Sequence, residues 1–129
     1  MNAPHYNNLD ITPTQVAQAL LELSRELAEA ASDFEELEKN AVDAENVYGL
    51  AREQKLLLAG EHDELRTADA RKAWAYVHCH NERIHAHLMA SKVRARKVLI
   101  DTLKTRVTIG QTVANALQSE IALDGVRRR

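Results

Sequence analysis

The sequence has few of the residues that make turns, crosslinks or membrane spans. Its 129 residues include only four glycines, two prolines and one cysteine, Cys79. Both prolines, Pro4 and Pro13, lie near the start, so we expect few turns and a few long elements after them. One cysteine excludes a disulfide within the chain, and no apolar run has the length of a signal peptide or a membrane span. The expected protein is therefore soluble and cytoplasmic, with no membrane partner.

Aromatic side chains are also scarce. They make up 4% of the chain, although hydrophobic residues as a whole make up 45% and many of these are alanine. Small side chains suit the narrow interface between two closely packed helices better than they suit a thick core. The composition therefore predicts an all-α protein, and the length is that of one domain.

A regular apolar pattern predicts the first long helix. Thr12 suits the N-cap and Pro13 the first helical position, so this helix is expected over about residues 13–59. Spacings of four and three residues alternate along it, which is the 3.5-residue period of a coiled-coil seam. The seam positions, of which only Lys55 is not hydrophobic, are Val16, Leu20, Leu23, Leu27, Ala30, Phe34, Leu37, Ala41, Ala44, Tyr48, Ala51, Lys55 and Leu58.

Gly60 predicts the turn that ends this helix. Glycine readily adopts the left-handed conformation that closes a helix, and Asp63 is placed to cap the next one. The second helix is expected over about residues 63–123, with a kink or an early end at Gly110. Its later half carries a seam at Met89, Val93, Ile100, Leu103, Val107, Ala114, Leu117 and Ile121. A second apolar stripe follows its first half at Ala70, Ala73, Val77, Ile84, Leu88, Ala95 and Val98.

The two halves of the chain differ in charge, which favours an antiparallel hairpin. Residues 1–60 contain four Lys or Arg against eleven Asp or Glu, whereas residues 61–129 contain thirteen against eight. A turn near residue 61 would place the acidic Glu22, Glu26 and Glu29 opposite the basic stretch 92–97. We therefore expect one hairpin domain of two long helices, of coiled-coil type, over residues 12–124. A flexible N-terminus (1–11) precedes it and a basic tail (125–129) follows.

Two adjacent apolar stripes on one helix need more than one partner helix. A hairpin alone would leave apolar surface exposed, so the chain is expected to associate with copies of itself into a helical bundle. The residues expected at the oligomer interface are large apolar members of the seams: Leu20, Leu23, Leu27, Phe34, Leu37, Ile100, Leu103, Val107, Leu117 and Ile121.

The segment from Tyr76 to His87 holds four of the six histidines beside the cysteine, and it is the densest candidate for a metal site. On one continuous helix, His78, Glu82 and His85 would share a face. Di-iron bundles use two Glu-x-x-His pairs with further glutamates, whereas this chain has one such pair. We therefore predict no metal and no cofactor. Cys79 is expected to be a small buried residue rather than a nucleophile.

Basic residues of the second helix and the tail form the one candidate for a nucleic-acid footprint. Phosphate binding needs such charges to be free and on one side of the molecule. Many of them would instead face acids of the first helix, so nucleic-acid binding is an alternative and not the favoured hypothesis. The candidate contacts are Lys92, Arg94, Lys97, Lys104, Arg106, Arg127, Arg128 and Arg129.

Two stretches of the chain resemble small helical proteins encoded by bacteriophages of actinobacteria: AENVYGLAREQKLLLAGEHDELRTADARKAWA and RARKVLIDTLKTRVTIGQTVANALQSEI. Such proteins have a long helix, a Leu-x-x-x-Gly turn and a second helix ending in IDxLxTxxxxGxxxxxxLxxE. The resemblance covers about residues 40–121. It implies a setting beside phage recombination and single-strand-annealing genes, in the cytoplasm of a bacterial host, and it implies no catalytic residues.

The sequence thus favours a non-enzymatic phage-type protein that associates with itself and binds another protein. That partner is expected to belong to viral DNA recombination or replication, or to be a host factor that the protein modulates. The alternatives are a DNA- or RNA-binding accessory, a structural scaffold or virion component, and a metal-binding four-helix bundle.

Overall fold

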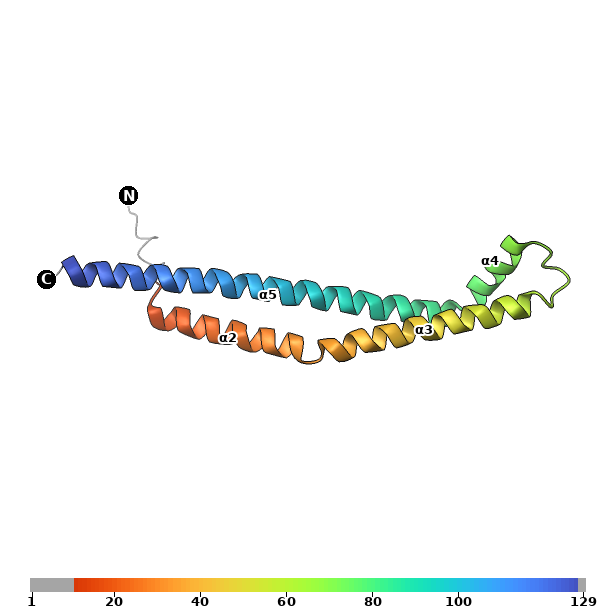
Figure 1. Ribbon diagram of the computed structural model, residues 1–129, viewed down its shortest axis with the longest axis horizontal. Coiled ribbons are helices and arrows are strands. Elements are labelled where there is room, and N and C mark those ends of the chain that lie inside the picture. Colours follow the sequence, from red (N-terminus) through yellow and green to blue (C-terminus); the bar gives the residue numbers. More distant parts are fainter. Residues whose placement is uncertain (1–10, 128–129) are drawn as a thin grey trace, which may run out of the picture. The chain divides into compact units, whose positions relative to one another are not determined.

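The computed structural model describes residues 11–127, and all regular structure in that range is α-helical, which confirms the all-α prediction. Four helices follow one another: α2 (Pro13–Ser32), α3 (Phe34–Ala59), α4 (Ala68–His78) and α5 (His80–Arg127) (Figure 1). They belong to two compact units. The first unit joins α2 to the part of α5 from Val98 onward, and the second unit is Ser32–Lys97.

A reciprocal cap starts α2. The Thr12 hydroxyl accepts a hydrogen bond from the backbone N–H of Gln15 (3.2 Å), and the Gln15 side-chain oxygen accepts one from the backbone N–H of Thr12 (3.0 Å). This arrangement is a capping box, and Pro13 fills the first helical position. The predicted start of the first helix is confirmed.

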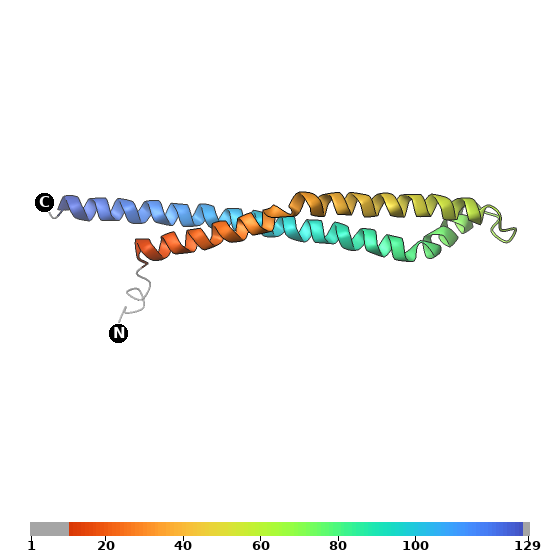
Figure 2. The same cartoon turned by 90° about the horizontal axis from the view of Figure 1, so that it is seen from below.

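In the first unit, α2 runs antiparallel to the part of α5 that follows Val98 (Figures 1 and 2). Leu20 lies against Gly110, and the start of α2 at Pro13 shares a small cavity with Leu117. The well-buried residues of this pair all come from the predicted seams: Val16, Ala30, Ile100 and Leu103. In this unit, therefore, the two seams close on each other within one chain.

The alignment of these two helices differs from the predicted one. A turn near residue 61 would set Leu20 beside Thr102, whereas Leu20 contacts Gly110, about two helical turns further along. The predicted turn is too short, because the chain is not helical between Ala59 and Ala68.

Gly110 lies inside a continuous helix, contrary to the predicted kink or early end, since α5 extends to Arg127. A Cβ atom at this position would lie 2.6 Å from Cδ2 and 3.3 Å from Cγ of Leu20. The glycine therefore allows a close approach of the Leu20 side chain. Gly125 and Val126 of the predicted basic tail also belong to α5, while Arg128 and Arg129 lie outside the described residues.

In the second unit, α4 packs along α3. The residues that are completely buried here are small: Ala59, Ala75 and Cys79. Small side chains permit this close packing, as the alanine-rich composition predicts. The first part of α5 then returns along α3, with His87 against Tyr48 and Arg96 in an ion pair with Asp33.

The predicted first helix is interrupted at Asp33, which separates α2 from α3. Asp33 does not cap α3 with its side chain, although its carbonyl accepts from the backbone N–H of Leu37 (2.9 Å). Its carboxylate binds Arg96 instead. Ser32 and Asp33 are both poor helix formers, because their short polar side chains compete for backbone hydrogen bonds. The run from Asp33 to Glu36 also has the spacing of a helix start.

The turn after α3 is built differently from the prediction. Gly60 keeps a right-handed helical conformation (φ −63°, ψ −21°), and the backbone N–H groups of Glu61 and His62 continue the turn by bonding to Leu58 and Ala59. The next helix begins at Ala68, and not at Asp63, because the Thr67 hydroxyl caps it by accepting from the backbone N–H of Ala70 (3.0 Å).

We expect Thr67→Ala to lower the free energy of unfolding by about 1 kcal/mol, since it removes the cap of α4. Asp63→Ala, at the position that the sequence alone predicts to be the cap, should change it by less than about 0.5 kcal/mol. Urea denaturation followed by circular dichroism measures both values. A larger loss for Asp63→Ala than for Thr67→Ala would contradict the observed start of α4.

Candidate functional site

A stripe of uncharged side chains runs along the first-unit part of α5, on the side opposite the seam. Its positions alternate by four and three residues, as in a coiled-coil seam, and every one of them is exposed. The chain has 28% charged residues, yet none of them lies at these positions. We call it the outer stripe; its members are Val98, Thr102, Thr105, Ile109, Thr112, Ala116, Ser119 and Leu123.

Two threonines of the outer stripe have their hydroxyl groups satisfied within the helix. Thr105 donates to the backbone carbonyl of Asp101 (3.0 Å), and Thr112 donates to that of Thr108 (3.1 Å). Such a bond to the preceding turn leaves the methyl group for contact with a neighbour. An apolar surface can therefore cover these positions without leaving an unpaired hydroxyl group.

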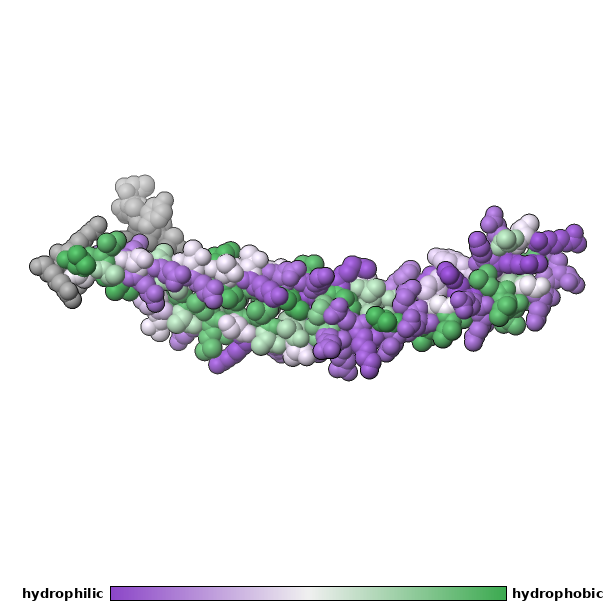
Figure 3. Space-filling view, viewed as in Figure 1, coloured by the Kyte–Doolittle hydropathy of each residue, from purple (hydrophilic) through white to green (hydrophobic). Residues whose placement is uncertain are grey.

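The edges of the outer stripe carry charges of both signs. Asp101 lies along one edge, while Arg106 and Glu120 lie along the other, and all three are exposed. Neither edge has the run of like charges that would repel an identical surface. Figure 3 shows hydrophobic side chains at the surface of the first unit among hydrophilic ones.

The second unit also exposes apolar side chains, at positions of the predicted second stripe. Val77 on α4 and Ile84 and Leu88 on α5 are each about half exposed or more. Ala73 and Ala95 are exposed as well, whereas Ala70 is half-buried. By its apolar residues alone, this stripe ends at Val98, because most positions that follow at the same spacing are threonine or serine. Those positions also lack charged residues, and this absence of charge is the sequence signal that the stripe continues along α5.

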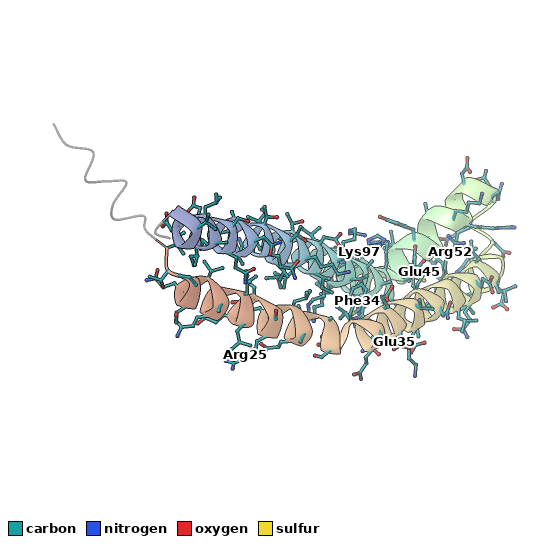
Figure 4. The ribbon with its side chains drawn as sticks, turned by 60° about the vertical axis from the view of Figure 1, so that its left-hand side comes forward. Arg25, Phe34, Glu35, Glu45, Arg52 and Lys97 are labelled. Carbon is teal, nitrogen blue, oxygen red and sulfur yellow. The ribbon has the colours of Figure 1, made fainter. Side chains whose placement is uncertain are left out.

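Most of the residues expected at an oligomer interface lie in the seams within the two units. Ile100 and Leu103 are buried, and Ile121 is 56% exposed near the end of α5. The remaining seven are half-buried, which leaves part of each side chain accessible: Leu20, Leu23, Leu27, Phe34, Leu37, Val107 and Leu117. Phe34 at the start of α3 is labelled in Figure 4.

The basic candidates for nucleic-acid contact do not gather on one side of α5. In the second unit, Lys92 and Arg94 are two residues apart and so about 200° apart around the helix. Lys97 is on the side of Arg94, whose guanidinium also donates to the hydroxyl of Ser91 (3.0 Å). In the first unit, Lys104 and Arg106 are separated in the same way. The side chain of Arg127, like Arg128 and Arg129, is outside the described part of the structure.

The histidine-rich segment is divided by a break between α4 and α5, so His78 and Glu82 do not lie on one continuous helix as predicted. His78 stacks on Trp74 with ring centroids 3.9 Å apart, and its Nδ1 lies 2.8 Å from the Trp74 carbonyl. His85 does not join this stack and instead lines a cavity together with Asp43 and Met89. Within residues 11–127, no three His, Cys, Asp or Glu side chains are placed to hold one metal ion.

Arg83 bridges the break between the two helices. It is nearly buried, its Nη1 donates to the Tyr76 carbonyl at the end of α4 (2.7 Å), and its guanidinium lies 3.5 Å from the centre of the Tyr76 ring. Its Nη2 lies 2.9 Å from Nδ1 of His80, and since a guanidinium can only donate, this Nδ1 accepts. The bonds supply a C-terminal cap for α4 and fix the ring of Tyr76.

Cys79 ends α4 and is completely buried, as predicted. Burial and the carboxylate of Glu82 raise the pKa of its thiol above the ordinary value of 9.0, although Lys55, Arg83 and Arg52 act in the opposite direction. The folded protein therefore holds the thiol in its neutral form, which is a poor nucleophile.

We expect Cys79 to react with a thiol reagent at pH 8 at least about 100-fold more slowly in the native protein than in denaturant. The raised pKa also means that its contribution to stability is complete below pH 9.0 and declines as the pH rises through the higher folded value. Equal labelling rates in the two states would show that the thiol is accessible.

None of the helices between residues 11 and 127 carries an apolar stretch that would span a lipid bilayer. The chain matches no protein-family model, no curated protein and no solved structure.

Proposed function

We propose that this chain is a non-enzymatic helical protein that associates with itself through the outer stripe of α5 and acts by binding another protein. The outer stripe carries this proposal, because it has the spacing of a coiled-coil seam, no charge, and no buried position in the single chain. A surface of this kind lowers its free energy by pairing with another helix.

A second copy of the chain is the partner that the outer stripe fits best. The helix pair of the first unit has only four well-buried residues, and two packed helices alone bury too little apolar surface for high stability. Two copies joined along the stripe form a four-helix bundle with an additional core between the two α5 helices. The mixed charges of Asp101, Arg106 and Glu120 allow this pairing without a row of like charges.

The second unit supplies the surface for a different protein. Val77, Ile84 and Leu88 are exposed there and offer apolar anchors of the kind that helical partners use. The resemblance to proteins of actinobacterial bacteriophages suggests the setting: an accessory to viral DNA recombination or replication, or a modulator of a host factor.

Sedimentation equilibrium of the full chain tests the self-association. We expect the average mass to rise with concentration from 14.5 kDa to a multiple of that value. A mass of 14.5 kDa at every concentration would contradict the proposal.

A further inference from the structure

A cavity of about 350 Å³ opens between α3 and α4 in the second unit. Tyr48, Arg52 and Leu56 line it from α3, and Lys72 and Tyr76 line it from α4. Figure 4 labels Arg52 on α3. The volume is within the range of small-molecule sites, and the lining combines two cations, two aromatic rings and one aliphatic wall.

The two cations of this cavity favour an anionic ligand. Arg52 and Lys72 come from different helices, and the lining contains no carboxylate. In the described part of the chain, the ion pair between Arg96 and Asp33 lies elsewhere, and neither Arg52 nor Lys72 has an acidic partner within 4.0 Å. A phosphate group that enters here can therefore bind a guanidinium and an ammonium group together.

Each of the two tyrosine rings has a neighbour outside the cavity. The Arg83 guanidinium covers one face of Tyr76, which is still 53% exposed, and His87 meets the Tyr48 ring edge to face at 6.5 Å. Aromatic rings at the wall of a cavity are suited to packing against a planar group. Leu56 adds an apolar contact for the same group.

We propose that this cavity is a nucleotide-binding site. The base packs against Tyr48, Tyr76 and Leu56, and the phosphate is held between Arg52 and Lys72. The site lies within the second unit, so it does not depend on self-association through the first unit.

Titration of the full chain with AMP, adenosine and inorganic phosphate tests the ligand class. Isothermal titration calorimetry measures the affinity for each compound. We expect saturable binding of AMP, with adenosine and phosphate each at least about tenfold weaker because each makes half of the contacts. No saturation by AMP at millimolar concentration, or phosphate binding as tightly as AMP, would overturn the assignment.

Single substitutions test the position of the site. We expect Arg52→Gln and Lys72→Gln each to weaken AMP binding about tenfold, because each removes one charged contact to phosphate. Both side chains are exposed, so the helical circular dichroism should be unchanged. Lys39→Gln is the matched control, since Lys39 is an exposed lysine on α3 that does not line the cavity. Equal weakening by Lys39→Gln and Lys72→Gln would show that general charge attraction, and not this cavity, binds the nucleotide.

Discussion

Leu103→Ala should lower the free energy of unfolding by about 3 kcal/mol, which is the largest effect that we expect from a single side chain. Leu103 is only 2% exposed and is the largest well-buried residue of the first unit together with Ile100. Its truncation removes apolar burial and leaves a cavity that two long helices cannot easily close. Urea denaturation followed by circular dichroism at 222 nm gives the change in unfolding free energy.

Leu21→Ala is the matched control for Leu103→Ala. Leu21 lies on α2 in the same unit, but it is 54% exposed and outside the seam. The same chemical change should therefore lower the unfolding free energy by less than about 1 kcal/mol. Similar losses in the two variants would mean that the pairing of α2 with α5 is not the source of stability in this unit.

Ile109→Glu should abolish self-association while leaving the fold of the single chain intact. Ile109 is 58% exposed at the middle of the outer stripe, so a carboxylate there is solvated in the monomer and would be buried only when two copies pair. Burying this charge without a partner costs several kcal/mol, enough to raise the dissociation constant by at least about 100-fold. Glutamate is also a good helix former, so the helical content should be unchanged.

Gln111→Glu separates the effect of position from the effect of charge. Gln111 is exposed on the same helix two residues away, where it belongs neither to the outer stripe nor to the seam. Sedimentation equilibrium should give the unmodified chain and Gln111→Glu the same mass, and Ile109→Glu a mass of 14.5 kDa. If Ile109→Glu remained associated to the same degree, the outer stripe would not be the interface.

The periodic features of the fold could be predicted from the sequence. The seam positions from Val16 to Ala51 face inward within their units, and the cap at Thr12 forms as predicted. These features depend on the spacing of apolar residues and on local hydrogen bonds, both of which are visible in one sequence. The helix breaks at Asp33 and Cys79 could not be found in this way, because the apolar spacing continues across both of them.

Tertiary interactions explain why these breaks occur where they do. The side chain of Asp33 does not cap α3 but forms an ion pair with Arg96, a residue far away in the sequence. At the second break, the residues from Tyr76 to Asn81 are all weak helix formers, which is a signal that only a propensity count would detect. Arg83 then satisfies the end of α4 by bonding to the carbonyl of Tyr76. Low helix propensity indicates where a helix can break, and the hydrogen bond from Arg83 stabilises the break at this position.

The candidate sites could be predicted only in part. The exposed Val77, Ile84 and Leu88 were expected from the second apolar stripe, whereas the serine and threonine positions that extend it were not. The cavity lined by Arg52 and Lys72 could not be predicted, because it forms only when α4 folds back on α3 as a separate helix. A continuous second helix starting at Asp63 would not bring Lys72 and Tyr76 to the same cavity as Arg52 in this way.

The contact between Leu20 and Gly110 limits the ways in which two repetitive helices can slide along each other. A seam with a seven-residue repeat looks nearly the same after a shift of one heptad, so apolar spacing alone allows several alignments. A shift of seven residues in either direction would bring Leu20 against Leu103 or Leu117, where the space that glycine leaves is filled by a large side chain. Gly110 is the only glycine at a seam position of α5, and its contact with Leu20 therefore favours this alignment of α2 on α5 over the shifted ones.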